Sequence, residues 1–158
     1  AKCWKQIMWN NSLPADLIAG IPNAGTPMAM ALWSQTSIEQ VQLVKGYVSG
    51  QRRITGVVHS SHTGSHEHTL LLDDVITGAD TKLEAVAALR TNGLTVRDLL
   101  VVVDRMHGGV KTLLRSNVIT YAIFQLDELL DYYVSQGDIT MAQQDEVMAY
   151  VQAQRTTG

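Results

Sequence analysis

The stretch from His68 to Arg90 reads HTLLLDDVITGADTKLEAVAALR and combines three patterns in a row. Thr69–Leu72 is a short apolar run, which is typical of a strand buried in a parallel sheet. Two acids and a loop containing Gly78 follow it. From Thr81 the apolar positions recur with helical spacing, and Asn92-Gly93 is a typical helix end. The stretch therefore predicts a strand, an acidic pair, a loop of small residues and a helix.

A unit of this kind can hold a phosphate group at the carboxyl edge of a sheet. Free backbone N–H groups and the positive end of the helix macrodipole face that edge. Acids do not attract phosphate, so Asp73 and Asp74 suit the hydroxyls of a ribose, or a metal ion that accompanies phosphates. An ordinary strand–loop–helix unit with surface acids is the alternative. The predicted helix carries four residues of one face at positions i, i+3, i+4 and i+7, namely Leu83, Val86, Ala87 and Arg90.

Predicted strands and helices alternate along the rest of the chain. Further strands are expected at Leu17–Ile21, Gln42–Lys45, Ile54–Ser60, Glu67–Leu72, Asp98–Val103 and Val118–Phe124. Further helices are expected at Ala1–Trp9, from Met28 to Trp33, after Gly108-Gly109, at Asp127–Val134 with Asp127 as its cap, and from Thr140 to Ala153. This alternation predicts an α/β fold with a central parallel sheet and helices on both faces.

Two segments of the predicted sheet are less regular. Gly46–Ile54 has no periodicity and is predicted to be a mobile loop. The strands on either side of residues 61–65 are predicted to pair as a hairpin. The groups at the strand ends should meet in one crevice, because ligands of such sheets lie beyond the carboxyl ends of the strands. These groups are Pro22–Pro27, Lys45, Asp73–Thr81 and Asp104-Arg105.

Composition restricts the classes of function. The chain has 158 residues, 46% of them hydrophobic and 17% charged, which indicates one globular domain with a core. Its net charge of −3 offers no basic excess for nucleic acid or an anionic membrane. The single cysteine, Cys3, excludes an internal disulfide and suits a reducing, cytoplasmic compartment. No apolar run approaches the roughly 20 residues of a membrane span.

The central stretch resembles the PRPP-binding motif of type I phosphoribosyltransferases, which has two acids, two apolar residues and then a Thr- and Gly-rich loop. Asp73–Thr77 match this motif as they stand. With the K-L-E-A-V helix, the strand ending in Asp104-Arg105 and the Gly108-Gly109 turn, residues 68–109 are similar to the orotate phosphoribosyltransferase family, and the weaker resemblance covers roughly residues 17–135. The resemblance implies a type I phosphoribosyltransferase-like α/β fold with a hairpin before the motif. Residues 1–135 would form the transferase domain and residues 136–158 a C-terminal helix.

The resemblance also implies the ligands and the site. The ligands would be PRPP, orotate and pyrophosphate, with Mg2+ as cofactor. PRPP would contact the motif and a loop resembling the family's pyrophosphate-binding loop, at Asp73, Asp74, Val75, Ile76, Thr77, Gly78, Ala79, Asp80, Thr81, Asn23, Ala24 and Gly25. Arg105 and Thr77 would bind orotate, and Asp73 and Asp74 would hold the metal through water. Lys45, Arg52 and Arg53 would be the catalytic cations of a loop that, in relatives, reaches across a homodimer to cover the leaving pyrophosphate.

The chain departs from the family pattern at several points. Gly78 and then Ala79 stand where the family usually has a small or hydroxyl residue and then Gly, and the charge of Asp80 is unfavourable beside the expected 5′-phosphate. The stretch KGYVSGQRRITG, residues 45–56, lacks the usual Lys-x-x-Lys-x-His/Tyr-Gly pattern. The chain opens without Met, directly in a helix-like segment. We therefore expect that an N-terminal part, including the hood that covers orotate in the family, is missing.

Three functions remain open at this level. The first is an orotate phosphoribosyltransferase of UMP synthesis. The second is a PRPP- or nucleotide-binding regulator without turnover, which Asp80 and the loop favour. The third is a domain of a fused pyrimidine-synthesis protein. A purine phosphoribosyltransferase fits less well, because those enzymes usually read the base without such an Asp-Arg pair. Separately, the histidines of HSSHTGSHEH suggest either a solvated hairpin tip, which is favoured, or a zinc or nickel site, at His59, His62, His66 and His68.

Overall fold

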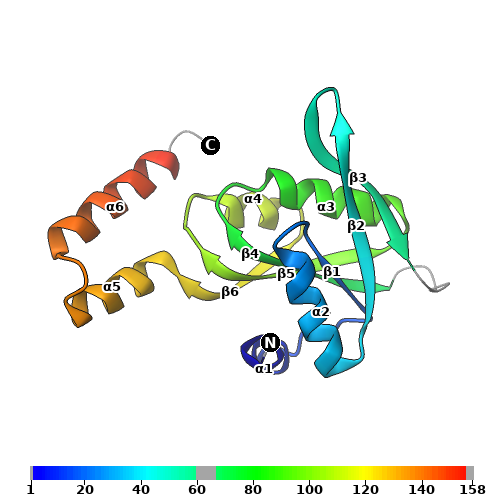
Figure 1. Ribbon diagram of the computed structural model, residues 1–158, viewed down its shortest axis with the longest axis horizontal. Coiled ribbons are helices and arrows are strands. Elements are labelled where there is room, and N and C mark those ends of the chain that lie inside the picture. The colour runs from blue at the N-terminus through cyan, green and yellow to red at the C-terminus, as the bar shows by residue number, and fades with distance from the viewer. Residues whose placement is uncertain (1, 60–66, 156–158) are drawn as a thin grey trace.

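A six-stranded sheet runs through the middle of the molecule (Figure 1). The computed structural model describes residues 2–59 and 67–155. The strand order is β3-β2-β1-β4-β5-β6, and every neighbouring pair is parallel except β2 and β3. The strands are β1 (Leu17–Gly20), β2 (Glu39–Val48), β3 (Gln51–His59), β4 (His68–Ile76), β5 (Thr95–Asp104) and β6 (Ile119–Gln125). The helices are α1 (Lys2–Asn10), α2 (Gly25–Thr36), α3 (Asp80–Thr91), α4 (Gly109–Arg115), α5 (Leu126–Gln136) and α6 (Met141–Arg155).

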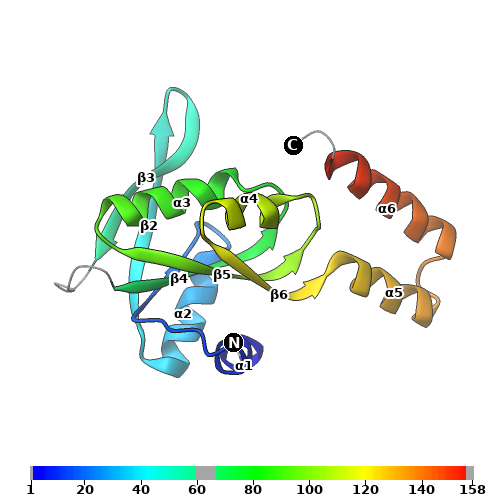
Figure 2. The same cartoon turned by 180° about the vertical axis from the view of Figure 1, so that it is seen from behind.

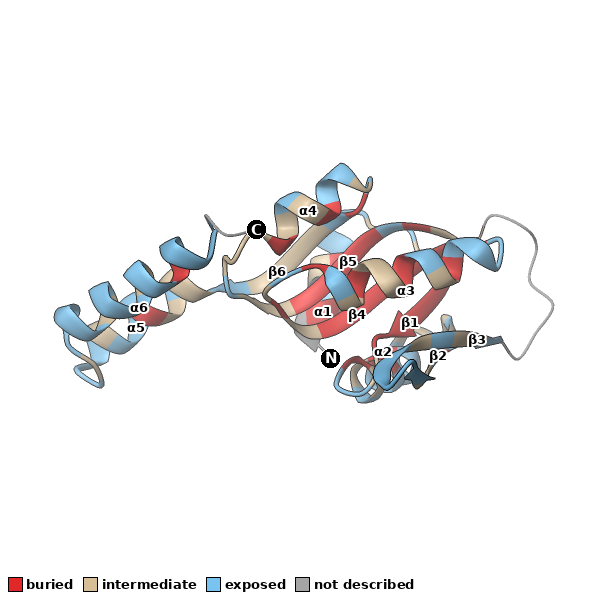
Figure 3. Cartoon of the chain, turned by 90° about the horizontal axis from the view of Figure 1, so that it is seen from above, coloured by how far each residue is buried: buried red, intermediate tan, exposed pale blue. Residues whose placement is uncertain are grey.

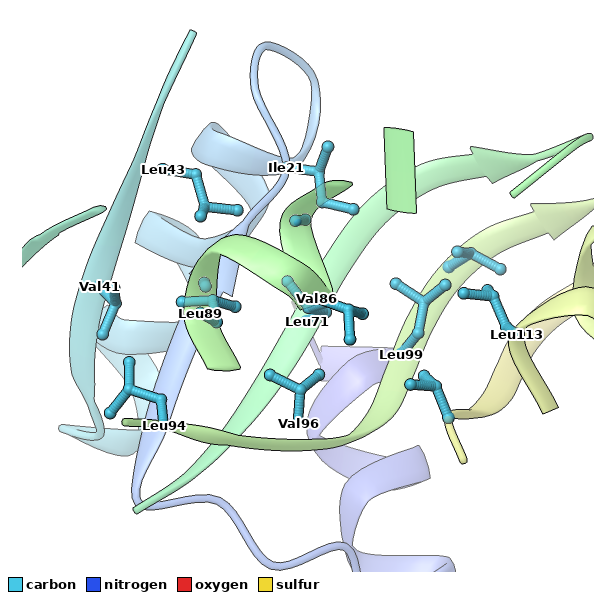
Figure 4. Close-up of a cluster of buried hydrophobic side chains, with 14 of the residues drawn as sticks. Ile21, Val41, Leu43, Leu71, Val86, Leu89, Leu94, Val96, Leu99 and Leu113 are labelled. Carbon is cyan, nitrogen blue, oxygen red and sulfur yellow. The ribbon is translucent and has the colours of Figure 1, made fainter. Parts of the chain in front are cut away.

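Helices cover both faces of the sheet, as the alternating pattern predicts. On one face, Val86 and Leu89 of α3 pack with Leu71 and Leu99 of the central strands (Figure 4). On the other face, residues of α1 and α2 such as Trp4 pack against β1, β4 and β5. Burying each such large apolar side chain contributes about 1.5–3 kcal/mol. Figure 3 shows that the buried residues concentrate in the central strands and in α3. None of the described helices is long and apolar enough to cross a bilayer.

A hairpin does precede the acidic pair, but it is formed by different strands from those predicted. β2 pairs with β3, whereas β4 lies beyond β2 and β1 in the strand order. The predicted mobile loop over Gly46–Ile54 is therefore wrong, since both strands run through it. Ser49 and Gly50 turn the chain with φ of 50° and 77°, which suits a tight hairpin turn. Gly46 misled the prediction: it is not a loop residue, and the missing Cβ leaves room for the Thr55 side chain across the pair.

The central unit extends further than its pattern predicts. β4 continues to Ile76, so the acidic pair lies inside the strand. The next helix begins at Asp80 and buries Lys82, Ala85, Val86 and Leu89. The predicted face is thus shifted, because Ala87 and Arg90 are exposed. The prediction failed because the first residue of the buried face is a charged one, Lys82.

The last two helices form an arm beside β6 (Figures 1 and 2). The cap of α5 is Gln125, in a capping box with Glu128, and not Asp127 as predicted. Thr140 does cap the last helix, since its Oγ1 accepts the N–H of Gln143 at 3.3 Å. Of the apolar face expected on α6, only Val151 is buried, while Met141 is 70% exposed.

Candidate functional site

Three loops meet at the carboxyl edge of the sheet, as the parallel order predicts. The loop after β1 is tied to β4, because the N–H of Ile21 donates to the carbonyl of Leu72 at 2.8 Å. The loop after β5 is tied to the end of β4, because the N–H of Arg105 donates to the carbonyl of Ile76 at 2.9 Å. The N–H of Gly109 reaches the carbonyl of Thr77 at 3.0 Å. Lys45 is not at a strand end, since β2 continues past it.

Two glycines allow these loops to approach one another. A Cβ on Gly25 would overlap the carbonyl oxygen of Leu72, and a Cβ on Gly109 would lie 2.5 Å from that of Thr77. Real Cβ atoms do not come this close to a backbone oxygen. The first turn of α2 and the first turn of α4 can therefore contact the central motif only because glycine occupies both positions.

The acidic pair has a cationic partner that sequence reasoning did not identify. Asp73 is 5% exposed, and its Oδ2 lies 2.7 Å from the Nζ of Lys82. The N–H of Asp74 donates to Oδ1 of Asp73 at 3.0 Å. Burial raises the pKa of Asp73, and the hydrogen bond and charge of Lys82 oppose that rise. Lys82 carries a usable signal in the sequence, because it is in helical phase with the buried residues Ala85 and Val86.

The segment from Thr77 to Thr81 leads from β4 into α3. Ala79 stands at the N-cap and makes no side-chain hydrogen bond to the first turn of the helix. The first N–H groups of α3 therefore lack a side-chain cap and can face an anion. Asp80, the first residue of α3, is exposed, and its charge competes with an anion there. Val75 and Ile76 belong to β4, and the Ile76 side chain is fully buried, so Ile76 offers only its backbone.

The structure separates the three cations that were predicted to act together. Arg52 does reach the predicted pyrophosphate loop of its own chain, because its Nη2 donates to Oδ1 of Asn23 at 3.3 Å. Arg53 instead forms an ion pair with Glu84 of α3. Lys45 lies opposite Ile54 in the β2–β3 ladder. Of these three cations, Arg52 is the one whose side chain donates a hydrogen bond to a loop of the crevice within the described residues.

The loop after β5 carries Arg105, whose side chain is exposed. Oδ1 of Asp104 accepts the N–H of Met106 at 2.7 Å. The rings of His107 and Tyr150 meet edge to face with centroids 6.0 Å apart, and Arg155 Nε donates to the carbonyl of Met106. The C-terminal helix α6 therefore takes part in the crevice. Sequence reasoning missed this contribution because the partners are more than 40 residues apart, at a separation of 49 for Arg155 and Met106.

The contact between the loop and α6 contains a titratable ring, that of His107. Burial lowers the pKa of His107 below its usual 6.5, the charges of Arg105 and Arg155 lower it further, and Asp104 opposes them. The stability gained from neutral His107 is therefore fully present above pH 6.5 and is lost as the pH falls through the lower folded-state pKa. We expect acidification from about pH 7.5 to about pH 5 to lower the melting temperature more in the wild type than in His107→Gln. Equal shifts in thermal unfolding experiments would contradict this assignment.

The residues present fit a magnesium ion that is held mainly by a substrate. Among the described residues, no three His, Cys, Asp or Glu side chains are grouped as a metal cage. Mg2+ often uses only one or two carboxylates together with substrate phosphates and water. Asp74 of β4 offers one such carboxylate, whereas the two carboxylate oxygens of the buried Asp73 already accept from Lys82 and from the N–H of Asp74.

The histidine cluster is not a single surface feature. His68 opens β4 at the end opposite the crevice, is buried, and its Nε2 lies 2.8 Å from Oδ2 of Asp98. The prediction that His68 belongs to a solvated hairpin tip is therefore wrong: its ring has a buried acidic partner. His62, His66 and the side chain of His59 lie outside the described residues, so the zinc or nickel hypothesis remains a prediction.

Several known proteins are similar to this chain in sequence or in fold. Orotate phosphoribosyltransferase of Caenorhabditis elegans is 26% identical over 154 residues, which cover 96% of this chain and 64% of that protein. Orotate phosphoribosyltransferase of Aquifex aeolicus is 35% identical over 123 residues, covering 73% of this chain and 64% of that protein. UMP synthase of Leishmania donovani superposes with a TM-score of 0.78 and 23% identity over 96% of this chain and 32% of that one. No family model matches the chain. The chain thus spans a little under two thirds of these first two relatives.

Proposed function

Because this chain is an orotate phosphoribosyltransferase-like member of the type I phosphoribosyltransferases, we propose that its protein transfers the phosphoribosyl group of PRPP to orotate. The products are orotidine 5′-phosphate and pyrophosphate, in the synthesis of UMP. The observation that carries the proposal is the joining of the acidic motif to the Arg105 loop, through the hydrogen bond from Arg105 N–H to the carbonyl of Ile76. This bond supports the proposal, because it holds the motif that would bind the sugar beside the loop that would bind the base.

Each element of the crevice has its own role in the proposed reaction. Asp74 would accept hydrogen bonds from the ribose hydroxyls and would hold Mg2+ through water, and Asp73 would act beside it through the remaining lone pairs of its carboxylate. The N–H groups of residues 77–81 hold the 5′-phosphate at the start of α3. The guanidinium of Arg105 orients the planar, anionic pyrimidine. Fixing both reactants in one crevice removes much of the entropic cost of their encounter.

The bond from C1′ to the pyrophosphate oxygen breaks while an orotate ring nitrogen bonds to C1′, and the proton of that nitrogen passes to the leaving pyrophosphate or to solvent. Mg2+, when bound to PRPP, supplies charge neutralisation for the leaving pyrophosphate. Arg52, next to Asn23, adds a fixed positive charge on the same side. Lys45 and Arg53 add positive charge at this place only if the hairpin moves. Arg53 is paired with Glu84, and Lys45 lies opposite Ile54 in the β2–β3 ladder.

The proposal includes a homodimer in a cytoplasmic compartment. A cavity of about 430 Å³ between α2 and the β2–β3 hairpin supports the dimer. Met30, Trp33 and Val58 line it and are 50–56% exposed. Apolar surface of this kind is typical of an interface. The single cysteine of the chain suits a reducing compartment.

One observation favours a second function. Asp80 places a negative charge at the N-terminal end of α3, where the proposal puts the 5′-phosphate. A protein that binds PRPP or a nucleotide as a regulator needs no turnover and tolerates weak phosphate binding. The similarity to UMP synthase over 32% of that protein also fits a domain of a fused enzyme.

The test is a calorimetric titration of PRPP with Mg2+, followed by orotate and an assay of pyrophosphate release. Arg105→Ala should lower kcat/KM for orotate by about 10- to 100-fold, because a charge-assisted hydrogen bond contributes about 1.5–3 kcal/mol, and it should leave PRPP binding intact. Arg97→Ala, at the other end of β5, is the matched control and should behave as wild type. PRPP binding without turnover would favour the regulator, and no PRPP binding would refute both functions.

A further inference from the structure

Helix α6 reaches back to the loop that carries Arg105. In Figures 1 and 2 the C-terminal end of α6 lies beside the loop between β5 and α4. Two side chains make the contact. Arg155 Nε donates to the carbonyl of Met106, and the ring of Tyr150 meets the ring of His107 at 69° with centroids 6.0 Å apart.

The loop needs support from outside itself. Met106 has φ of 63°, a left-handed conformation that side chains other than glycine adopt at a cost. Inside the loop, Asp104 Oδ1 holds the N–H of Met106 at 2.7 Å. The carbonyl of Met106 and the ring of His107 are held instead by α6. Arg105 therefore stands directly before a strained residue whose conformation depends partly on a distant helix.

The arm that delivers these contacts is itself fixed. α5 follows β6 without a loop, and Gln125 of β6 pairs with Asp104 of β5. Gln144 Nε2 of α6 donates to Oδ1 of Asp131 of α5 at 2.6 Å. Val151 of α6 is 1% exposed and Leu130 of α5 is 8% exposed, so both side chains are buried. β5, which ends directly before Arg105, is thus paired with β6, the strand from which the arm extends.

The contact between α6 and the Arg105 loop does not fill the space between them. A cavity of about 290 Å³ lies between the loop, the start of α4 and the end of α6. Lys111 and Arg155 line it from different helices, and Asp104 lines it with the opposite charge. α6 therefore braces the loop at two points, through Met106 and His107, and does not bury it.

We propose that Arg155 and Tyr150 are positioning residues, which hold Met106 and His107 so that the guanidinium of Arg105 is presented to the pyrimidine. This inference rests on the proposed function, because it takes Arg105 as the orotate-binding residue. A guanidinium recognises a planar acceptor only over a narrow range of orientations. A small displacement of its loop therefore weakens binding of the base and leaves the PRPP motif unaffected.

The experiment compares Arg155→Ala, Arg155→Lys, Tyr150→Ala and Tyr150→Phe with the wild type in the full chain. Arg155→Ala and Tyr150→Ala should each raise the KM for orotate by about tenfold, with the KM for PRPP unchanged. Arg155→Lys keeps a donor for Met106, and Tyr150→Phe keeps the ring, so both should retain most of the orotate affinity. Glu146→Ala, an exposed change on the same helix, is the matched control.

Amide hydrogen exchange gives a readout that is independent of catalysis. Arg155→Ala should speed exchange of the Met106 amide and leave that of Leu83 in α3 unchanged. Unchanged orotate KM, or equal rises in both KM values, would overturn the positioning role. If the wild type shows no orotate use, the proposed function fails and the inference for orotate fails with it. Faster exchange in the variant would then show that only the structural contact survives.

Discussion

Lys82→Met is expected to lower the free energy of unfolding by about 3 kcal/mol or more at neutral pH and to weaken PRPP binding. The reason is the ion pair of 2.7 Å between Lys82 and the 5%-exposed Asp73. Removing one partner of a buried pair leaves an uncompensated charge, which typically costs about 3–5 kcal/mol. Urea unfolding and PRPP calorimetry measure the two effects.

The pH dependence of this variant identifies the cause. The folded-state pKa of Asp73 already lies above the usual 3.8, chiefly because the carboxyl is buried, and loss of Lys82 should raise it further. A raised carboxyl pKa means that the stability from the neutral form is present below pH 3.8 and is lost as the pH rises through the folded-state pKa. The deficit of the variant should therefore shrink as the solution is acidified.

Two further variants complete the test of Lys82. Lys111→Met removes an exposed lysine from α4 and should change stability little. Asp73→Asn combined with Lys82→Met removes both charges and should recover part of the lost stability, because replacing a whole buried pair is often nearly neutral. If Lys82→Met unfolds like Lys111→Met, the pair does not stabilise the site.

Gly25→Ala is expected to destabilise the protein by a steric route. The added Cβ would overlap the carbonyl oxygen of Leu72, which also accepts the N–H of Ile21 at 2.8 Å. Backbone atoms cannot rotate away as a side chain can, so the first turn of α2 must move. Overpacking of this kind costs about 1–3 kcal/mol and occasionally more. We expect a lower melting temperature and loss of PRPP binding, since the pyrophosphate loop and the motif would separate.

The control for this substitution lies in the same crevice. Gly78→Ala places its Cβ in open space, with nothing within 4 Å, and its φ is not in the left-handed region. It should fold as wild type. Equal loss of stability in Gly25→Ala and Gly78→Ala would mean that close approach of the two loops is not what glycine provides at residue 25.

Parallel topology explains what sequence reasoning could predict here. Short apolar runs alternating with helical patterns require a sheet whose carboxyl ends share one edge, so the strand pattern alone predicts that Asp73, Asp74 and Arg105 lie near one another. The glycines were harder to interpret. Gly46 resembles a loop residue in the sequence, yet it lies in a strand because a partner side chain occupies the place of its missing Cβ.

The contacts that the sequence did not reveal are long-range or involve buried charge. Helical phase with Ala85 and Val86 puts Lys82 on the buried face of α3, but it does not identify Asp73 as the partner that allows a lysine to be buried there. Arg53 looks like a free cation in its local sequence, although Glu84 lies 31 residues away in the chain and next to it in space. No local pattern encodes such partners. They follow from the packing of β3 and β4 beside α3, which only the fold determines.

The hairpin also has a consequence for handling the protein. β3 lies at one edge of the sheet, so its outer side has no neighbouring strand, although the N–H of Ile54 donates to Glu84 Oε2 at 3.3 Å, and such edges invite aggregation by strand addition. Arg52 and Arg53 are exposed on this strand and act as gatekeepers, because charge disfavours stacking of one edge on another. Neutralising them would therefore reduce solubility as well as any catalytic contribution. Catalytic rates of such variants therefore have to be normalised to the concentration of soluble, unaggregated protein rather than to total protein mass.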